Sequence, residues 1–274
     1  MEKPVNYLAE TGERASFVQR VLETAQAELA LSPGLKVLVK PNIVSREPYP
    51  TTTHPQVLAS VLDFLLGHEC QVVVADGPAF DAGSSDRILS AHPLGAVCRA
   101  RGIELQNLHK HGFRKVRAKG GMSLEVSSLA FDLDCIISLP VLKPHQHCRM
   151  TGALKNQFGF LRNRERIMMH ARLKSLSRGI AEVNTIVRPS FFIMDAVNTY
   201  RHANERRHGG DEVQLGRMLA GRDPVALDAL GLELLKGTEP RLRGAKPEDV
   251  AYIGHSLKLG LGSTAYQVEN LSGT

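Results

Sequence analysis

Residues 135–156 read CIISLPVLKPHQHCRMTGALKN, and this stretch decides the predicted fold. Its first six residues form a short, continuous apolar run, which is typical of a strand buried on both faces. The run leads into a polar segment rich in Lys, His and Asn, where Thr151 and Gly152 open a short helical turn. A buried strand that leads into charged residues and then a helix is the repeating unit of an α/β protein.

The same order of strand and helix recurs on both sides of this stretch. Further strands are expected at 35–39, 71–75, 103–108 and 190–194, and helices at 13–31, 54–67, 94–101, 164–187, 223–236 and 247–262. The alternation predicts an α/β fold with a mostly parallel sheet and helices on both faces. In such folds ligands bind in a cleft at the carboxyl ends of the strands, so we expect the cleft there.

Length and composition indicate how the chain is organised. The chain has 274 residues, of which 43% are hydrophobic and 23% charged, and a single α/β domain over residues 1–274 is expected. Residues 141–165 and 196–217 lack a regular pattern, so a basic irregular sub-lobe is expected near 141–217. No apolar run approaches the roughly 20 residues of a membrane span. Because the first residues also lack an apolar signal core, we expect no membrane partner and a cytoplasmic location.

Positive charge is concentrated in one segment. Residues 143–178 contain nine Lys and Arg and one acid, Glu165, so this segment carries +8 while the net charge of the chain is only +6. Such a local excess is typical of a site for an anionic ligand, a nucleic acid or an acidic partner, although a solvated helix face is the alternative. Trp is absent and aromatic residues make up 5%, which disfavours nucleic acid as a partner. The sequence leaves a homo-oligomer open.

The sequence does not identify a cofactor. The four cysteines, at 70, 98, 135 and 148, form no C-x-x-C pair, so no iron–sulfur cluster is expected. No G-x-G-x-x-G and no Walker lysine motif occurs, so a standard NAD or ATP site is disfavoured.

Charged or amide residues follow four of the predicted strands. In chain order they are Lys40 and Asn42, Asp76, Lys143 and His145, and Asp195. Because the carboxyl ends of parallel strands meet at one edge of a sheet, these side chains are expected to line one crevice.

An anionic small molecule is the expected ligand of this crevice. The side chains expected to bind it are Lys40, Asn42, His54, Thr151, Lys155 and Asn156. The helical turn after Thr151 is expected to contribute as well, because free N–H groups at a helix start attract anions. Alternatively, Thr151 and His54 only cap their helices.

Proton transfer is expected from His145, His170 and Lys143. His170 is either a core histidine with a buried partner or a general acid/base at the cleft wall. Clustered lysines lower one another's pKa, so Lys143 can itself act as a base. The carboxylates expected to orient a histidine or bind a metal are Asp76, Asp195 and Asp228. In its apolar setting, Asp228 is expected to meet a lysine or a backbone donor.

The adjacent residues His145, His147 and Cys148 are weak candidates for a metal site. Two histidines one residue apart point to opposite sides of an extended backbone, so this segment alone makes a poor zinc site.

Several of these motifs together resemble the family catalogued as domain of unknown function 362. The motifs are KPN at 40–42, THP at 53–55, DG at 76–77, SLPVLKPH at 138–145, TGALKN at 151–156, FG at 158–159, His170, Asp195 and AGRDPVALD at 220–228. Many members of the family carry ferredoxin-like cysteine motifs; this sequence has none, so no electron-transfer role is carried over. A looser likeness, in the expected fold alone, is to the amino-terminal domain of lactate racemase.

The leading hypothesis is an enzyme that binds a carboxylate- or phosphate-bearing small molecule or cofactor and performs acid/base chemistry on it. One alternative is a metal-dependent enzyme that uses the segment with His145, His147 and Cys148. Another is a non-catalytic binding or assembly protein that docks an acidic partner through residues 143–178.

Overall fold

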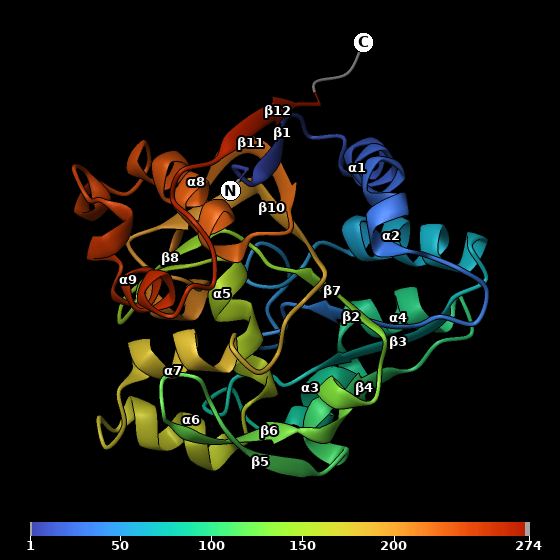
Figure 1. Ribbon diagram of the computed structural model, residues 1–274, viewed down its shortest axis with the longest axis horizontal. Coiled ribbons are helices and arrows are strands. Elements are labelled where there is room, and N and C mark those ends of the chain that lie inside the picture. Colours follow the sequence, from blue (N-terminus) through green and yellow to red (C-terminus); the bar gives the residue numbers. More distant parts are fainter. Residues whose placement is uncertain (1, 272–274) are drawn as a thin grey trace.

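A twisted sheet of eight strands crosses the part of the chain that the computed structural model describes, residues 2–271 (Figure 1). Its strands are β1 (Val5–Glu10), β2 (Lys36–Pro41), β3 (Gln71–Asp76), β4 (Leu105–Asn107), β7 (Cys135–Leu139), β10 (Phe191–Arg201), β11 (Asp211–Gly221) and β12 (Gln267–Asn270). Their order across the sheet is β12-β1-β11-β10-β7-β2-β3-β4. Only the pairings β1–β11 and β10–β11 are antiparallel, so the sheet is mostly parallel, as predicted.

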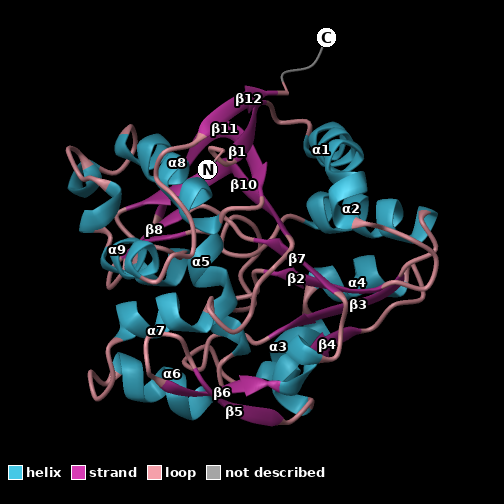
Figure 2. Ribbon diagram, viewed as in Figure 1, coloured by secondary structure: helices cyan, strands magenta, loops and turns pink. Residues whose placement is uncertain are grey.

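Helices and two small hairpins surround this sheet (Figure 2). The helices are α1 (Arg14–Leu29), α2 (Pro55–Gly67), α3 (Ser85–Ala91), α4 (Pro93–Arg99), α5 (Ala153–Asn156), α6 (Asn163–His170), α7 (Leu176–Val183), α8 (Pro224–Lys236) and α9 (Ala251–Lys258). The hairpins pair β5 (Phe113–Arg117) with β6 (Ser123–Ser127) and β8 (Lys143–His145) with β9 (Arg149–Thr151).

Successive side chains of the central strands enter two separate apolar cores. In β2, Val37 and Val39 belong to the core that α1, α2, α3 and α4 cover, whereas Leu38 belongs to the core beneath α5, α7, α8 and α9. The prediction of helices on both faces is therefore confirmed. Burial on both faces also explains why the central strands have continuous apolar sequences rather than alternating ones.

The helix predicted over residues 164–187 is wrong, because the structure forms α6 and α7 with a turn between them. Leu173, which the helical spacing placed in the core, lies in this turn and is 78% exposed. Two local features interrupt the helix: Arg172 has a left-handed φ of 61°, and the Ser175 hydroxyl caps α7 by accepting a hydrogen bond from the Arg178 amide.

The irregular stretch predicted at 196–217 is also wrong, because most of it forms the antiparallel pair β10 and β11. Polar residues such as Asn198 and Glu212 hid the strand pattern, since this end of the hairpin is only partly covered and its side chains bond to each other. The strands β12 and β1, the first two at one side of the sheet, were missed as well. They lie outside the parallel centre, where the apolar signal is weaker.

Thr53 ties together the elements that end at the centre of the sheet. Its hydroxyl accepts a hydrogen bond from the Asn42 amide (2.7 Å) and donates one to the Leu139 carbonyl (2.8 Å). One buried side chain therefore joins the end of β2, the end of β7 and the segment that precedes α2.

The variant Thr53→Val tests this connection. Valine keeps the shape of threonine but leaves the Asn42 amide without its acceptor, so we expect the free energy of unfolding to fall by about 1–3 kcal/mol. Urea denaturation measures the change. The control is Thr24→Val on the exposed face of α1, for which a change below about 0.5 kcal/mol is expected. An equal effect of both variants would contradict the role given to Thr53.

Candidate functional site

A cavity of about 230 Å³ opens at the carboxyl ends of β2, β3 and β7. Each wall comes from a different part of the chain. The polar side chains on it are those of Lys40, Asn42, Asp76, Asp81, Lys143, His145, Gln146, His147, Thr151, Lys155, Asn156, Arg166, His170, Asn204, Glu205, Arg207 and His208. Ten of the candidate residues inferred from the sequence are among them.

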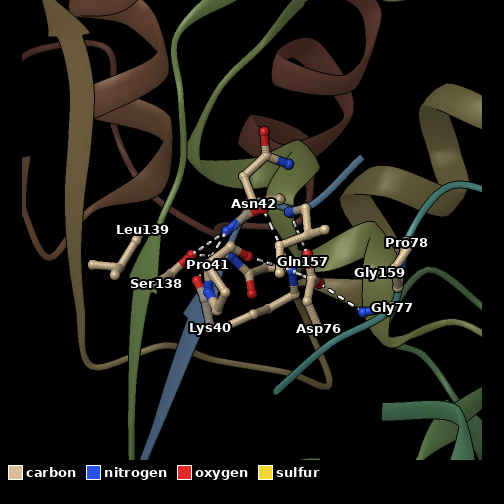
Figure 3. A network of polar contacts seen from close by, with 12 residues as sticks. Lys40, Pro41, Asn42, Asp76, Gly77, Pro78, Ser138, Leu139, Gln157 and Gly159 are labelled. Atoms are coloured by element: carbon tan, nitrogen blue, oxygen red, sulfur yellow. Dashed lines mark hydrogen bonds and ion pairs between the residues drawn. The ribbon is translucent and has the colours of Figure 1, made fainter. Parts of the chain in front are cut away.

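A buried ion pair between Lys40 and Asp76, both labelled in Figure 3, lines this cavity. The Lys40 ammonium lies 2.5 Å from Asp76 Oδ1, and the two side chains are 1% and 2% exposed. Asp76 is held in turn by the amides of Ile43 (2.6 Å) and Gly77 (2.8 Å). Burial lowers the pKa of Lys40, and the Asp76 carboxylate opposes this shift.

Amide side chains attach the short helix α5 to the sheet beside this ion pair. Asn156 and Gln157 each donate a hydrogen bond of 2.9 Å to the Ser138 hydroxyl on β7. The Asn156 carbonyl oxygen also lies 3.4 Å from the Lys40 nitrogen. The sequence TGALKNQ thus places α5 beside the ends of β2 and β7.

Two glycines allow these segments to approach one another (Figure 3). A Cβ on Gly159 would lie 2.8 Å from Asp76 Oδ1 and 3.1 Å from the Lys40 nitrogen. A Cβ on Gly77 would collide with the Gly159 carbonyl oxygen. The DG and FG motifs are therefore explained by close backbone packing around the ion pair.

Lys143 and Lys155 place two more ammonium groups on the cavity. Lys143 is buried and donates hydrogen bonds to Asn42 Oδ1 (3.0 Å) and to the Thr51 carbonyl oxygen. Burial lowers its pKa to about 7, and the charge of Lys155 acts in the same direction. The Lys155 nitrogen lies 5.9 Å from the centre of the Phe158 ring and has no hydrogen-bond or ion-pair partner in residues 2–271. Burial lowers its pKa as well.

Arg166, from α6, is a cation of the site that the sequence analysis did not single out. Its side chain is buried and donates to the carbonyl oxygens of Gly77 (2.9 Å) and Pro78 (2.8 Å). Its Nε has no partner within the described residues, and the same holds for the buried hydroxyl of Thr151. The sequence indicated Arg166 only as one of the nine basic residues of 143–178. No sequence feature distinguishes it from exposed neighbours such as Arg164.

The charges on the cavity do not balance. Asp76 pairs with Lys40, and Glu205 and Asp81 both pair with Arg207 (2.5 and 3.2 Å). Lys143, Lys155 and Arg166 have no carboxylate partner among residues 2–271. The other six basic residues of 143–178 lie elsewhere. Arg162 pairs with the partly buried Glu125, and Lys174 and Arg178 pair with the buried Glu165 and Glu182. Arg149, Arg164 and Arg172 are exposed.

The hydrogen bonds of two histidines on the cavity define their neutral tautomers. His145 Nδ1 accepts from the amides of His147 (3.1 Å) and Cys148 (3.3 Å), so its proton is on Nε2. His170 Nδ1 lies 2.8 Å from the Arg166 carbonyl oxygen and must donate to it, so Nε2 carries the lone pair. Burial lowers the pKa of both rings and favours these neutral forms.

Two candidate residues lie away from the cavity and have structural contacts. His54 caps α2 by accepting from the Gln56 amide (3.1 Å). Asp195 forms a buried ion pair with Arg14 (2.7 Å) and accepts a hydrogen bond from the Tyr49 hydroxyl (2.7 Å). Both follow strands or precede helices at the predicted edge, but neither side chain lines the cavity.

Asp228 corrects the expectation that the start of α5 binds an anion. Its carboxylate accepts hydrogen bonds from the amides of Ala153 (2.5 Å) and Leu154 (3.2 Å), so the donors of this helix start are already used. The prediction that Asp228 meets a backbone donor is confirmed. Burial raises its pKa to about 7.

The residues proposed for a metal do not converge on one point. The ring centres of His145 and His147 are 6.1 Å apart, and Cys148 is buried in the apolar core beneath α5 and α8. Residues 2–271 contain no group of three or more His, Cys, Asp or Glu side chains arranged to hold a metal ion. The geometry therefore gives no support to a metal centre built from this segment.

The chain belongs to the family described as Domain of unknown function (DUF362), whose pattern matches residues 37–233. It is 26% identical over 245 residues to a thylakoid-associated protein of Synechocystis sp., covering 87% of this chain and 72% of that protein. None of the helices in residues 2–271 is long and apolar enough to cross a membrane. The cytoplasmic location stays a prediction.

Among solved structures, the fold is similar to that of the lactate racemase apoprotein from Thermoanaerobacterium thermosaccharolyticum. The TM-score is 0.51 at 15% sequence identity, and the match covers 79% of this chain. It covers 54% of the racemase, so this chain spans about half the length of that protein. At this identity the match establishes a shared fold.

The variant Gly159→Ala tests the packing around the Lys40–Asp76 pair. The added methyl group would force the pair apart, so we expect a loss of about 1–3 kcal/mol in the free energy of unfolding. Gly67→Ala at the end of α2 is the matched control, because a Cβ there has no neighbour within 4 Å. Urea denaturation of both variants measures the difference, and a Gly159→Ala protein as stable as the control would show that the contact is not restrictive.

Proposed function

We propose that this protein is an enzyme that binds a small carboxylate- or phosphate-bearing molecule in the cavity and performs acid/base chemistry on it. The observation that carries the proposal is the charge imbalance: Lys143, Lys155 and Arg166 meet at one cavity without a carboxylate partner in residues 2–271. Cations that are removed from water and left without a counter-charge are costly, and an anionic ligand would offset that cost.

The hydrogen-bond donors of the cavity support the same class of ligand. Arg166 Nε and the Thr151 hydroxyl are buried and have no acceptor in the described residues. Most buried polar groups are hydrogen-bonded, so these two free donors, with the charges of Lys143 and Lys155 on the same cavity, are matched by the oxygens of a carboxylate or phosphate.

The two histidines supply the acid/base part of the proposal. His145 presents an N–H and His170 a lone pair, both at Nε2, and both rings line the cavity. His170 is therefore assigned as the base that removes a proton from the ligand. His145 is assigned as the donor that stabilises the negative charge formed on a ligand oxygen, as a neutral imidazole can.

The non-catalytic alternative, docking of an acidic partner through residues 143–178, receives less support. A docking surface needs its charges on the outside. Three of the nine basic residues instead face the cavity, and three more are paired with glutamates.

The pH dependence of anion affinity tests the role of Lys143. Because its pKa is lowered to about 7, Lys143 loses its charge as the pH rises through neutrality. We expect the affinity for sulfate, which stays dianionic, to fall about tenfold between pH 6 and pH 8. Isothermal titration calorimetry measures it. The variant Lys143→Met is expected to bind weakly at both pH values, and a wild-type affinity that does not change with pH would contradict the assignment.

Proton exchange tests the catalytic part. If His170 removes a proton from carbon, the protein will exchange for deuterium in D₂O the C2 hydrogen of a suitable 2-hydroxy acid or the C3 hydrogens of a suitable 2-oxo acid. Proton NMR of a panel of such acids follows the loss of signal. We expect His170→Gln to slow the exchange about 100-fold or more. Exchange at the wild-type rate in His170→Gln would exclude His170 as the base.

A further inference from the structure

Lys155 differs from the other two lysines of the cavity in having no polar partner. Lys40 is held by Asp76, and Lys143 is held by Asn42 and the Thr51 carbonyl. The Lys155 nitrogen lies 5.9 Å from the centre of the Phe158 ring and has no hydrogen bond or ion pair in residues 2–271. Anion binding alone does not require a lysine without polar partners. A lysine that only supplies positive charge is oriented more firmly by neutral acceptors, as Lys143 is by the oxygens of Asn42 and Thr51.

The surroundings of Lys155 favour its neutral, nucleophilic form. The Lys155 side chain is half-buried, and this loss of water contact is the largest effect on its pKa, which it lowers. The Arg166 guanidinium acts in the same direction, while Cys148, Glu205 and Asp81 act against it, and the net shift is downward. Lys155 and Lys143 also repel each other electrostatically. Desolvation beside another cation is a known way for a protein to activate a lysine as a nucleophile.

We propose that Lys155 forms an imine with the carbonyl carbon of an anionic ligand of the 2-oxo acid class. This inference rests on the proposed function, because Lys143 and Arg166 are needed to hold the carboxylate of the same molecule. It adds a covalent step and restricts the ligand to compounds that carry a ketone or aldehyde beside the anionic group.

The reaction is balanced without an added reagent. The Lys155 ammonium first gives a proton to a base in the cavity, for which His170 Nε2 is available. The nitrogen lone pair then forms a bond to the carbonyl carbon, and the carbonyl oxygen takes up a proton from the His145 N–H. The nitrogen, now positively charged, gives one of its two protons back to His145. His170 returns the proton it took to the new hydroxyl group, which leaves as water as the nitrogen lone pair forms the C=N bond. Overall, ammonium and ketone give a protonated imine and one water molecule.

The imine would make the acid/base chemistry easier. A protonated imine withdraws electrons from the neighbouring carbon more strongly than a ketone does, so a proton on that carbon becomes more acidic. His170 then acts on a C–H bond that the covalent link has already activated. The proposal therefore explains why Lys40 and Lys143 have polar partners while Lys155, on the same cavity, has none.

Borohydride trapping with pyruvate tests the proposal. Sodium borohydride reduces an imine to a stable secondary amine, which adds the mass of one pyruvate less the oxygen atom that leaves as water. The wild-type protein is incubated with pyruvate and borohydride, and its intact mass and peptide map are measured. We expect one adduct per chain, located on Lys155, with labelling at least about tenfold above that of the exposed Lys115, and competition by sulfate.

The controls separate this proposal from the proposed function. Lys155→Met should lose the adduct, and Lys115→Met should keep it; because the peptide map locates the site in the wild-type protein, the test does not depend on the folding of either variant. An adduct on Lys143, or equal labelling of Lys115, overturns the proposal. If sulfate binds to the wild type but pyruvate gives no adduct, the imine is excluded and the anion site stands. If neither binds, both proposals fall.

Discussion

The buried ion pair between Lys40 and Asp76 is the interaction on which the arrangement of the site depends. It joins the ends of two neighbouring strands, β2 and β3, and occupies both oxygens of Asp76 with close donors. A buried charge pair is stable only when its hydrogen bonds are complete, and this requirement determines what surrounds it. Gly77 and Gly159 leave room for the backbone, and Asn156 reaches the lysine from α5.

Satisfying Lys40 in this way has a consequence for the rest of the cavity. Asp76 is a deeply buried acid on the cavity, and its charge is used by Lys40. Glu205 is likewise used by Arg207. The cations from β8, α5 and α6 therefore have no carboxylate partner in the described residues. Lys143 and Arg166 bond to neutral oxygens, and Lys155 has no polar partner there. The number of Lys and Arg side chains on the cavity exceeds the number of acids, and the pairing of the acids determines which cations are left without a partner.

The two proposals for the cavity, anion binding and imine formation, assign different roles to basic side chains according to whether those side chains have hydrogen-bond partners. Lys143 and Arg166 are held rigidly by carbonyl oxygens, which suits groups that orient an anion. Lys155 is left without polar contacts, which suits a nucleophile. His145 and His170 use Nδ1 for backbone contacts and keep Nε2 available in two different protonation states. For each of these side chains, the proposed role follows from its hydrogen-bond partners more than from its residue type.

The amino-acid sequence by itself determined the α/β class, the mostly parallel centre of the sheet and the end of the sheet at which polar residues collect. These features follow from local signals: apolar runs of strand length, helix starts such as Asp223-Pro224, and the polar residue after each strand. It did not reveal the turn at Leu173 or the β10–β11 hairpin, where partial exposure removes the regular pattern.

Only the tertiary structure decided which of the candidate residues share one cavity. Asp76 and Asp195 both follow apolar strands, yet one lines the cavity and the other pairs with Arg14. Asp228 occupies the helix start that was expected to bind an anion, and Arg166 reaches the site from a helix whose other basic residue, Arg164, is exposed. The physical reason is that the role of a charged side chain depends on the group with which it pairs. Partners such as Arg14 and Asp195, which are 181 residues apart, are brought together only by the fold.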